Sequence, residues 1–448
     1  MRVKLSTLGC RLNEAELAVW SRELEARGCR IAHAGDPADL VVLNTCAVTA
    51  EAVRKSRKQL RRLQRDNPRA RVVVSGCAVS LEHEDQLGEL GVDLTVHNRD
   101  KDRLVAIARE ALALPLMPEG ATEPGAAALF VRGRQRAFVK IQDGCRYQCT
   151  FCITTRARGG ERSRPVSEVC REVDQLVADG IQEVVLTGVH AAGYGSDIGS
   201  SLDALIRAVL ANTDVARLRL GSVEPWDLSE RFWRLFESTR MMPHLHLPLQ
   251  SGADSVLKRM ARRCKTHDFA QMVDRARSVV VGFNVTTDII VGFPGETERE
   301  WAQTLAFVDE IGFGDLHIFS YSPRRGTRAA EMPDQVPAAV KRERSQALHA
   351  LVHRLKRRAL DAQLDSIHPV LIEGFQTGIQ GATQVGYTPS YQLVAVATAG
   401  ADLSNRIHPV RIERVIDAAE QTSSSDGARA PALLLGGSLI DHGPGGPG

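Results

Sequence analysis

The chain has 448 residues, which is enough for about three domains of roughly 150 residues each. Hydrophobic residues make up 43% and charged residues 25%, a composition that excludes a disordered or low-complexity chain. The formal net charge of +3 is small, so a nucleic-acid-binding surface would have to come from a local concentration of basic residues. Nine cysteines are too few for a disulfide scaffold, and no apolar run reaches the ~20 residues that span a bilayer. With no signal peptide at residues 1–10, we expect a cytoplasmic protein with reduced thiols and no membrane contact.

Residues 1–114 alternate between short apolar strands and helices. The expected strands are 3–8, 40–43 and 71–75, and the expected helices are 13–27 and 49–65. Such alternation is typical of a parallel sheet covered by helices. The next segment, 115–135, is rich in proline and glycine and is expected to be a linker, although an ordinary surface loop has a similar composition.

The alternation resumes over residues 136–365. Strands are expected at 137–142, 183–187, 217–222, 244–249, 286–291 and 315–321. Helices are expected at 166–179, 202–211, 228–238, 254–260, 269–280 and 298–311. Repeated βα units in one segment predict a partial (β/α)6 barrel, and a doubly wound open sheet is the alternative.

Residues 366–418 change to β-structure, with glycine and proline between the apolar stretches 370–373, 391–397 and 410–413. They predict a small all-β domain. The remaining segment, 419–448, is rich in serine, glycine and proline and is expected to be a disordered tail. The predicted fold class is therefore α/β, with a parallel α/β domain, a partial barrel and a C-terminal all-β domain in that order.

Three cysteines form a C-x3-C-x2-C motif, namely Cys145, Cys149 and Cys152. The motif directly follows the first expected barrel strand, so its thiols should lie at the C-terminal mouth of the barrel, where such folds place their active sites. Three thiolates on one loop can hold three irons of a 4Fe–4S cluster and leave the fourth open to a ligand that is not protein. Structural zinc would need a fourth ligand, which the loop lacks, and inert thiols are the remaining alternative.

A second set of cysteines, Cys10, Cys46 and Cys77, follows the three expected N-terminal strands. All strand C-termini of a parallel sheet share one edge, so these thiols should meet and form a second three-thiolate metal site. Gly9 and Gly76, just before two of them, would let the backbone approach a bulky cluster. Three buried structural cysteines are the alternative, which is also our interpretation of the remaining three, Cys29, Cys170 and Cys264.

The helix after Cys46 concentrates positive charge. Its basic residues, with two just beyond it, are Arg54, Lys55, Arg57, Lys58, Arg61, Arg62, Arg65, Arg69 and Arg71. Only Glu51 and Asp66 offset them within the helix. Its place beside the expected metal site favours a phosphate-binding face for RNA over an ordinary solvated helix.

With these motifs the chain resembles the radical S-adenosylmethionine methylthiotransferases over residues 1 to about 416. The two cysteine sets carry the resemblance, together with the stretches 186–190 (LTGVH), 193–197 (GYGSD), 222–225 (SVEP), 246–252 (HLPLQSG) and 287–296 (TDIIVGFPGE). The resemblance implies a radical S-adenosylmethionine barrel and a C-terminal RNA-binding domain of the TRAM type. It also implies S-adenosylmethionine and two 4Fe–4S clusters, one that cleaves S-adenosylmethionine and one that supplies sulfur.

For the S-adenosylmethionine pocket we expect Thr187, Gly188 and Glu224 at barrel strand ends, although a salt-bridged loop carboxylate is an equal alternative for Glu224. His244 and His246 alternate along one strand and face the same way, so a metal pair is one interpretation of them. Because better metal sites exist in this chain, we do not expect these two histidines to bind metal.

Three stretches, 8–13 (LGCRLN), 44–49 (NTCAVT) and 315–323 (DLHIFSYSP), resemble the branch that acts on N6-threonylcarbamoyladenosine in tRNA, at position 37 on the 3′ side of the anticodon. That branch converts the nucleoside to its 2-methylthio derivative. Implied partners are tRNA, a sulfur donor and an electron donor of flavodoxin or ferredoxin type. The alternatives are the sister branches that act on isopentenyladenosine or on a ribosomal-protein aspartate, and a non-catalytic iron–sulfur carrier. Arg324 and Arg325 are candidate partners for the threonylcarbamoyl carboxylate.

Overall fold

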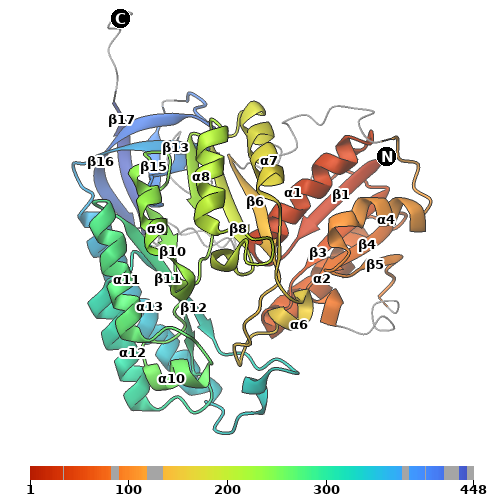
Figure 1. Cartoon of the computed structure of the whole chain (residues 1–448). Coiled ribbons are helices and arrows are strands. Elements are labelled where there is room, and N and C mark those ends of the chain that lie inside the picture. The colour runs from red at the N-terminus through yellow and green to blue at the C-terminus, as the bar shows by residue number, and fades with distance from the viewer. Residues whose placement is uncertain are drawn as a thin grey trace, which may run out of the picture.

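The computed structural model describes residues 1–33, 35–81, 90–118, 135–375, 383–398, 400–417 and 433–440. Three sheet-based units follow one another along the chain, coloured red to orange, yellow to teal and blue in Figure 1. Most of the expected linker, residues 119–134, lies outside the described residues. No helix in the described part of the chain is both long and apolar enough to cross a membrane.

The first unit is a five-stranded parallel sheet with the order β2-β1-β3-β4-β5. Its elements are β1 (Arg2–Thr7), α1 (Arg11–Glu25), β2 (Arg30–Ile31), β3 (Leu40–Thr45), α2 (Ala50–Asp66), β4 (Arg71–Gly76), β5 (Leu94–Val96) and α4 (Leu104–Ala111). Every residue of β3 is buried, as expected for a central parallel strand with helices on both faces. The parallel sheet predicted from the alternation is confirmed; β2, β5 and α4 were not predicted because they are short.

Helix α2 begins where its sequence provides a cap. The Thr49 hydroxyl accepts a hydrogen bond from the backbone N–H of Ala52 at 3.1 Å, which satisfies one of the free donors of the first turn. Ser56, Leu60 and Leu63 form its buried face against the sheet. The basic residues therefore point outward on the opposite face.

The second unit is a partial barrel of parallel strands in the order β6-β8-β9-β10-β11-β12. The bridges Leu218–Met241 and Ser222–His246 join β9 to β10, so the two hydrogen-bonded sheets form one curved wall. The strands are β6 (Arg136–Asp143), β8 (Glu183–Gly188), β9 (Arg217–Leu220), β10 (His244–His246), β11 (Asn284–Val291) and β12 (Asp315–Ser320), with β7 (Arg162–Ser163) antiparallel at the edge. The partial barrel is confirmed over the doubly wound alternative.

Helices cover the outside of this wall (Figure 1). They include α7 (Val166–Ala178), α8 (Leu202–Asn212), α9 (Glu230–Trp233), α10 (Asp254–Arg259), α11 (Thr266–Val279), α12 (Glu298–Ile311) and α13 (Ala338–Asp361). The short helix α6 (Thr154–Arg158) lies instead against the first domain. Alternate strand residues such as Leu186, Leu245 and Val285 pack under these helices in the largest apolar core. The intervening residues face the concave side of the wall, which is polar.

The third unit is a closed barrel in the order β13-β14-β15-β17-β16. Its strands are β13 (Ile367–Phe375), β14 (Thr383–Tyr387), β15 (Leu393–Ala397), β16 (Ile407–Asp417) and β17 (Leu433–Leu439). The all-β prediction is confirmed, but the prediction of a disordered tail from 419 onward is wrong for β17. Three consecutive leucines, Leu433 to Leu435, are buried there, and β17 closes the barrel by pairing with β15 and β16.

The β-barrel docks against the N-terminal ends of the parallel strands. Arg217 donates to the carbonyl oxygens of Tyr387 and Thr388 at 3.1 and 3.0 Å, and Arg219 donates to that of Pro389 at 3.0 Å. The buried Glu183 carboxylate lies 2.9 Å from both guanidiniums. The cysteine loop lies at the opposite end of the parallel barrel, directly after the C-terminal end of β6.

Candidate active site

The C-x3-C-x2-C loop leaves β6 through a turn that requires glycine. Gly144 has φ +74°, and a Cβ there would lie 1.9 Å from the Gly160 carbonyl oxygen. Cys145, Cys149 and Cys152 follow and are all partly exposed, so a ligand can reach them. Backbone N–H groups, from Tyr147 to Cys145 Sγ and from Thr154 to Cys152 Sγ, both at 3.4 Å, donate toward the sulfurs. Such donors stabilise thiolate ligands.

Arg262 is a further member of this site that sequence reasoning missed. Its Nη1 lies 3.9 Å from Cys149 Sγ, and its guanidinium lies 4.3 Å from the centre of the Trp226 ring. Burial raises the pKa of the Cys145 thiol to about 12, so that thiol is protonated at neutral pH unless a metal replaces the proton. The charge of Arg262 acts on Cys152, where it opposes the upward pKa shift that burial causes.

Glu224, just beyond β9, faces the cysteine loop closely enough that its charge raises the pKa of Cys145. Its side chain is only 15% exposed, and Oε2 is fully buried without a hydrogen-bond partner in the described structure. Burial raises the pKa of Glu224 itself. A buried carboxylate oxygen without a hydrogen bond is costly, but Oε2 also lies at ion-pair distance, 3.8 Å, from His190 Nε2. The geometry is therefore compatible both with the salt-bridged carboxylate and with a ligand that has hydrogen-bond donors.

Thr187 and Gly188 end β8 beside the same loop. A Cβ at Gly188 would lie 3.1 Å from Gln142 Oε1, while Gln142 Nε2 donates to the Gly144 carbonyl oxygen at 2.8 Å. Gln142 Oε1 also accepts from the backbone N–H of His190 at 2.8 Å. The ends of β6 and β8 are therefore held together, and the predicted residues Thr187, Gly188 and Glu224 all border the cysteine loop.

His190 was not predicted as a site residue, yet it anchors this rim. Its Nδ1 lies 2.5 Å from Glu161 Oε1 and its Nε2 lies 2.8 Å from Asp227 Oδ2, which also accepts from the Tyr147 hydroxyl at 2.8 Å. Burial opposes the charged ring, but the surrounding carboxylates raise the pKa of His190 overall. This network fixes Tyr147, inside the cysteine motif, to the loop that carries Glu224.

The second cysteine set forms as predicted at the C-terminal edge of the first sheet. Cys10, Cys46 and Cys77 lie just after β1, β3 and β4, and their charges act on one another. Gly9 has φ +106°, and a Cβ there would lie 2.7 Å from Cys46 Sγ. Burial raises the pKa of Cys46 to about 11. The glycine leaves open the space beside the thiols that a bulky inorganic group would need.

Arg158 links the two cysteine sets. It ends α6, the helix that follows Cys152, and its Nε donates to Cys77 Sγ at 3.3 Å. It also forms 2.9 Å ion pairs with Glu16 of the first domain and Asp143 of the barrel. Its side chain is 2% exposed. A cation buried between the two domains therefore touches a predicted metal ligand.

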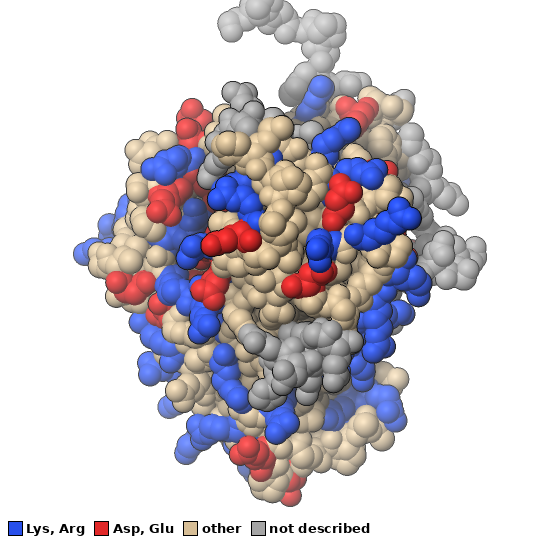
Figure 2. Space-filling view, turned by 90° about the vertical axis from the view of Figure 1, so that its right-hand side faces the viewer, with Lys and Arg blue, Asp and Glu red and all other residues tan. Residues whose placement is uncertain are grey.

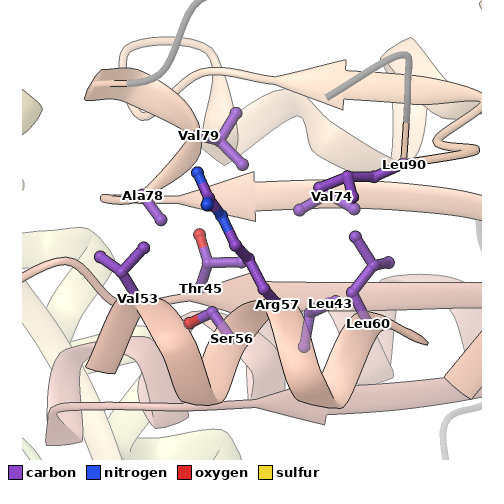
Figure 3. Close-up of a pocket in the computed structure, with 10 residues that line it drawn as sticks. All are labelled: Leu43, Thr45, Val53, Ser56, Arg57, Leu60, Val74, Ala78, Val79 and Leu90. Carbon is purple, nitrogen blue, oxygen red and sulfur yellow. The ribbon is translucent and has the colours of Figure 1, made fainter. Parts of the chain in front are cut away.

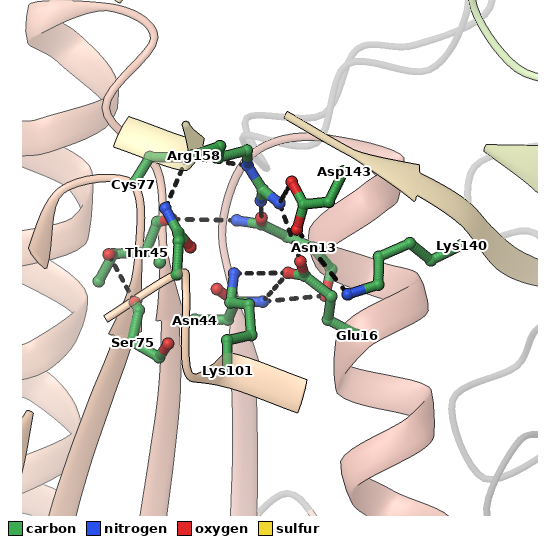
Figure 4. A network of polar contacts seen from close by, with 12 residues as sticks. Asn13, Glu16, Asn44, Thr45, Ser75, Cys77, Lys101, Lys140, Asp143 and Arg158 are labelled. Carbon is green, nitrogen blue, oxygen red and sulfur yellow. Dashed lines mark hydrogen bonds and ion pairs between the residues drawn. The ribbon is translucent and has the colours of Figure 1, made fainter. Parts of the chain in front are cut away.

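The polar network around Arg158 continues inside the first domain. Arg158 Nη2 donates to Asn13 Oδ1 at 2.8 Å, and the buried Lys101 pairs with Glu16 Oε2 at 2.6 Å (Figure 4). Asn44 Nδ2 also donates to Glu16 Oε2 at 2.9 Å. These residues position α1, β3 and the barrel relative to one another, and their large sequence separations explain why the sequence did not reveal them.

The basic face of α2 lies beside the second cysteine set. All nine predicted basic residues are exposed, and Figure 2 shows basic side chains along the flanks of the face that includes the first domain. Within the described residues, Arg54, Lys58, Arg61 and Arg69 have no carboxylate at ion-pair distance. Arg57 is different, because its side chain crosses an apolar pocket between α2 and the sheet (Figure 3). Arg54, Lys58, Arg61 and Arg69 are therefore the residues of this set whose charge is most available to a phosphate.

His244 and His246 do not face a common ligand. His244 stacks on Tyr391 with ring centres 4.7 Å apart, whereas His246 Nε2 lies 3.1 Å from Asp288 Oδ1. Both rings share the Thr286 hydroxyl, at 3.1 and 3.0 Å. Arg324 is half-buried and Arg325 exposed, beyond β12.

The wall of parallel strands and the cysteine loop at its C-terminal mouth define a radical S-adenosylmethionine barrel. The model of the radical SAM superfamily matches residues 139–308, and that of the uncharacterized protein family UPF0004 matches residues 2–96. A solved radical S-adenosylmethionine methyltransferase, TsrM from Kitasatospora setae, shares the fold with a TM-score of 0.54 and 16% identity, over 73% of this chain and 77% of its own.

Relatives that match over nearly the whole of both chains show which family of radical S-adenosylmethionine enzymes this chain belongs to. The chain is 36% identical over 425 residues to threonylcarbamoyladenosine tRNA methylthiotransferase MtaB of Bacillus subtilis, covering 92% of this chain and 93% of that protein. It is 32% identical over 426 residues to tRNA-2-methylthio-N(6)-dimethylallyladenosine synthase of Syntrophomonas wolfei, covering 92% and 95%. The chain belongs to the radical S-adenosylmethionine methylthiotransferase family, enzymes that use S-adenosylmethionine and an iron–sulfur cluster to transfer a sulfur-containing group.

Proposed function

We propose that this enzyme adds a methylthio group to C2 of N6-threonylcarbamoyladenosine at position 37 of tRNA, in the cytoplasm. The observation that carries the proposal is the pair of three-cysteine sites at the C-terminal strand ends of two adjoining sheets. Arg158 donates to Cys77 of one site and pairs with Asp143, two residues before Cys145, beside the other. The C2–H bond of adenine is unactivated, and no acid or base side chain functionalises it, so cofactors have to carry the reaction. A carrier protein would need neither a substrate-sized barrel nor a second site.

Cys145, Cys149 and Cys152 would hold one 4Fe–4S cluster, and Cys10, Cys46 and Cys77 a second. When bound, the first supplies the electron that cleaves S-adenosylmethionine and the second supplies sulfur. Three thiols and a nearby cation suit such a group at both positions, and Gly9 leaves space beside the thiols of the second set. An electron donor of flavodoxin or ferredoxin type and a sulfur donor would complete the reaction.

The protein's own residues bind and orient the reactants. Glu224 would accept hydrogen bonds from S-adenosylmethionine through the buried Oε2, and Thr187 with Gly188 would border the same pocket. Arg262 would neutralise part of the thiolate charge beside Cys149. The exposed cations of α2 would contact tRNA phosphates next to the second cluster.

Relatives from two branches match at similar identity, so the substrate is the finer part of this proposal. The stretch 315–323, which ends the barrel, favours the threonylcarbamoyl branch. Nucleoside mass spectrometry of tRNA from a strain that lacks the gene tests this directly. The strain should lose 2-methylthio-threonylcarbamoyladenosine and accumulate its precursor, whereas loss of the isopentenyl product would assign the enzyme to the sister branch.

A further inference from the structure

The concave face of the barrel carries a cluster that the cofactor sites do not use. His246 of β10, Asp288 of β11 and His317 of β12 lie at neighbouring positions on three adjacent strands. Their sequence neighbours Leu245, Ile289 and Leu316 belong to the outer apolar core. Because side chains alternate along a strand, the cluster faces the interior of the barrel.

One carboxylate organises both histidines. His246 Nε2 and His317 Nδ1 each lie 3.1 Å from Asp288 Oδ1, and His246 Nδ1 lies 3.0 Å from the Thr286 hydroxyl. Both ring nitrogens of His246 are therefore occupied. His317 is bonded through Nδ1 alone in the described structure, and its side chain is 66% exposed, which leaves Nε2 open to the barrel interior.

The charged state of His317 is set by its surroundings. The hydrogen bond to Asp288 raises the pKa of His317, with further support from the charges of Asp288 and Asp315, while burial and the nearby Arg11 act in the opposite direction. The net shift is upward. A protonated His317 has an N–H at Nε2 that is free to donate to an anion.

A second cation approaches from the first domain. Arg11 begins α1, directly after Cys10, and its guanidinium lies 5.1 Å from the centre of the Phe138 ring on the concave side of β6. Its Nη1 pairs with Glu14 at 3.1 Å, but the side chain is 53% exposed and a guanidinium has five N–H donors. Arg11 also lies close enough to His317 for its charge to act on that ring, so the two cations come together between the second cysteine set and the barrel wall.

We propose that Arg11 and His317 together bind the carboxylate of the threonylcarbamoyl group, and that Asp288 and His246 orient His317 for this contact. The inference rests on the proposed function and explains how the enzyme would distinguish the threonylcarbamoyl substrate from the isopentenyl one. A cationic pair recognises a carboxylate and gives nothing to an isopentenyl group, whose burial would leave both donors unpaired. The position of Arg11 next to Cys10 would hold the nucleoside beside the second cluster.

The same cluster offers ligand atoms for a divalent cation, since one atom from each of the three residues lies within 4.8 Å of the others. We favour the anion because Arg11 adds positive charge at this position, which repels a metal ion. Metal analysis of the loaded enzyme distinguishes the two: loss of a stoichiometric zinc, manganese or non-cluster iron on replacement of His317 would overturn the proposal.

The test uses loaded full-length enzyme and anticodon stem-loops carrying threonylcarbamoyladenosine or its neutral carboxamide analogue. His317→Gln and Arg11→Gln should each raise the Kd for the natural stem-loop roughly 10–100-fold, the range of a hydrogen bond to a charged group, and barely change the Kd for the carboxamide. His349→Gln, an exposed histidine on α13 bonded to the Ser345 carbonyl oxygen, is the control and should change neither.

Equal weakening of both stem-loops, or no weakening, would overturn the carboxylate contact. The proposed function is tested separately by the unmodified enzyme in the same assay. If the unmodified enzyme makes no methylthio product from the natural stem-loop, the proposed function fails. If it does make the product while the variants keep its affinity for the natural stem-loop, only this inference fails.

Discussion

The buried ion pairs of Arg158 with Glu16 and Asp143, which we call the Arg158 junction, should hold the first domain and the barrel together. Arg158→Gln removes two 2.9 Å ion pairs, to Glu16 and to Asp143, at a position that is 2% exposed. Removing one partner of a buried ion pair costs about 3–5 kcal/mol. Glu16 keeps Lys101 at 2.6 Å, so we expect the lower end, about 3 kcal/mol.

Hydrogen exchange of α1 measures this cost, because its amides exchange when the junction opens locally. A loss of about 3 kcal/mol should speed that exchange roughly 100-fold. The variant should also lose iron from the second cysteine set, since Cys77 loses its charged donor and keeps the longer one, Asn98 Nδ2 at 3.7 Å. Arg162→Gln is the matched control, because Arg162 lies 3.9 Å from Asp143 but is 45% exposed. If hydrogen exchange and iron content were unchanged in Arg158→Gln, Arg158 would not stabilise the contact between the two domains.

Three further predictions concern binding and stability. Replacing Arg54, Lys58 and Arg61 with Gln should lower the log–log salt slope of tRNA binding by roughly three, as measured by titration at several salt concentrations. Glu224→Gln should weaken S-adenosylmethionine binding about tenfold in equilibrium dialysis with iron content unchanged. Although burial acts in the opposite direction, neighbouring guanidiniums lower the pKa of Glu183 from 4.5 to about 2. The free energy of unfolding that this ion pairing contributes, about 3 kcal/mol, is therefore present above pH 4.5 and lost as the pH falls toward 2. Acid unfolding of cluster-free protein should show this loss, and Glu183→Gln should flatten it.

Each of these has an outcome that would contradict it. An unchanged salt slope would return α2 to an ordinary solvated face, and exchanging Arg342, Arg354 and Arg358 of α13 controls for net charge. Iron loss in Glu224→Gln would show that this carboxylate supports the cysteine loop rather than the cofactor. If the stability of Glu183→Gln fell with pH as steeply as that of the parent, the ion pairs of Glu183 would not be the source of the acid sensitivity.

The sequence predicted the positions of the two cysteine sets for two different reasons. Cys10, Cys46 and Cys77 each follow an apolar strand, and parallel strands bring their C-termini together regardless of the residues between them. The C-x3-C-x2-C loop is local, so its spacing alone predicts its chemistry.

Arg158, Arg262 and Lys101 could not be predicted in the same way. Each acts on residues far away in the chain, and a single buried arginine or lysine has no periodic signal. The strand β17 was missed because its short leucine run precedes Gly436 and Gly437 and follows a polar segment. His244 and His246 share a strand face, but the His244 ring stacks on Tyr391 of the C-terminal β-barrel. The alternation along a strand cannot predict a contact with another domain.

We propose that the two cysteine sites have different roles in one methylthiolation reaction on threonylcarbamoyladenosine. The most direct measurement loads the enzyme anaerobically and determines iron, S-adenosylmethionine cleavage and RNA product together. The parent should hold about eight irons and make the methylthio product, and Cys46→Ala should hold about four, still cleave S-adenosylmethionine and make no product. Cys149→Ala should abolish cleavage. Unchanged methylthio product from Cys46→Ala, or product only on isopentenyladenosine RNA, would contradict the account.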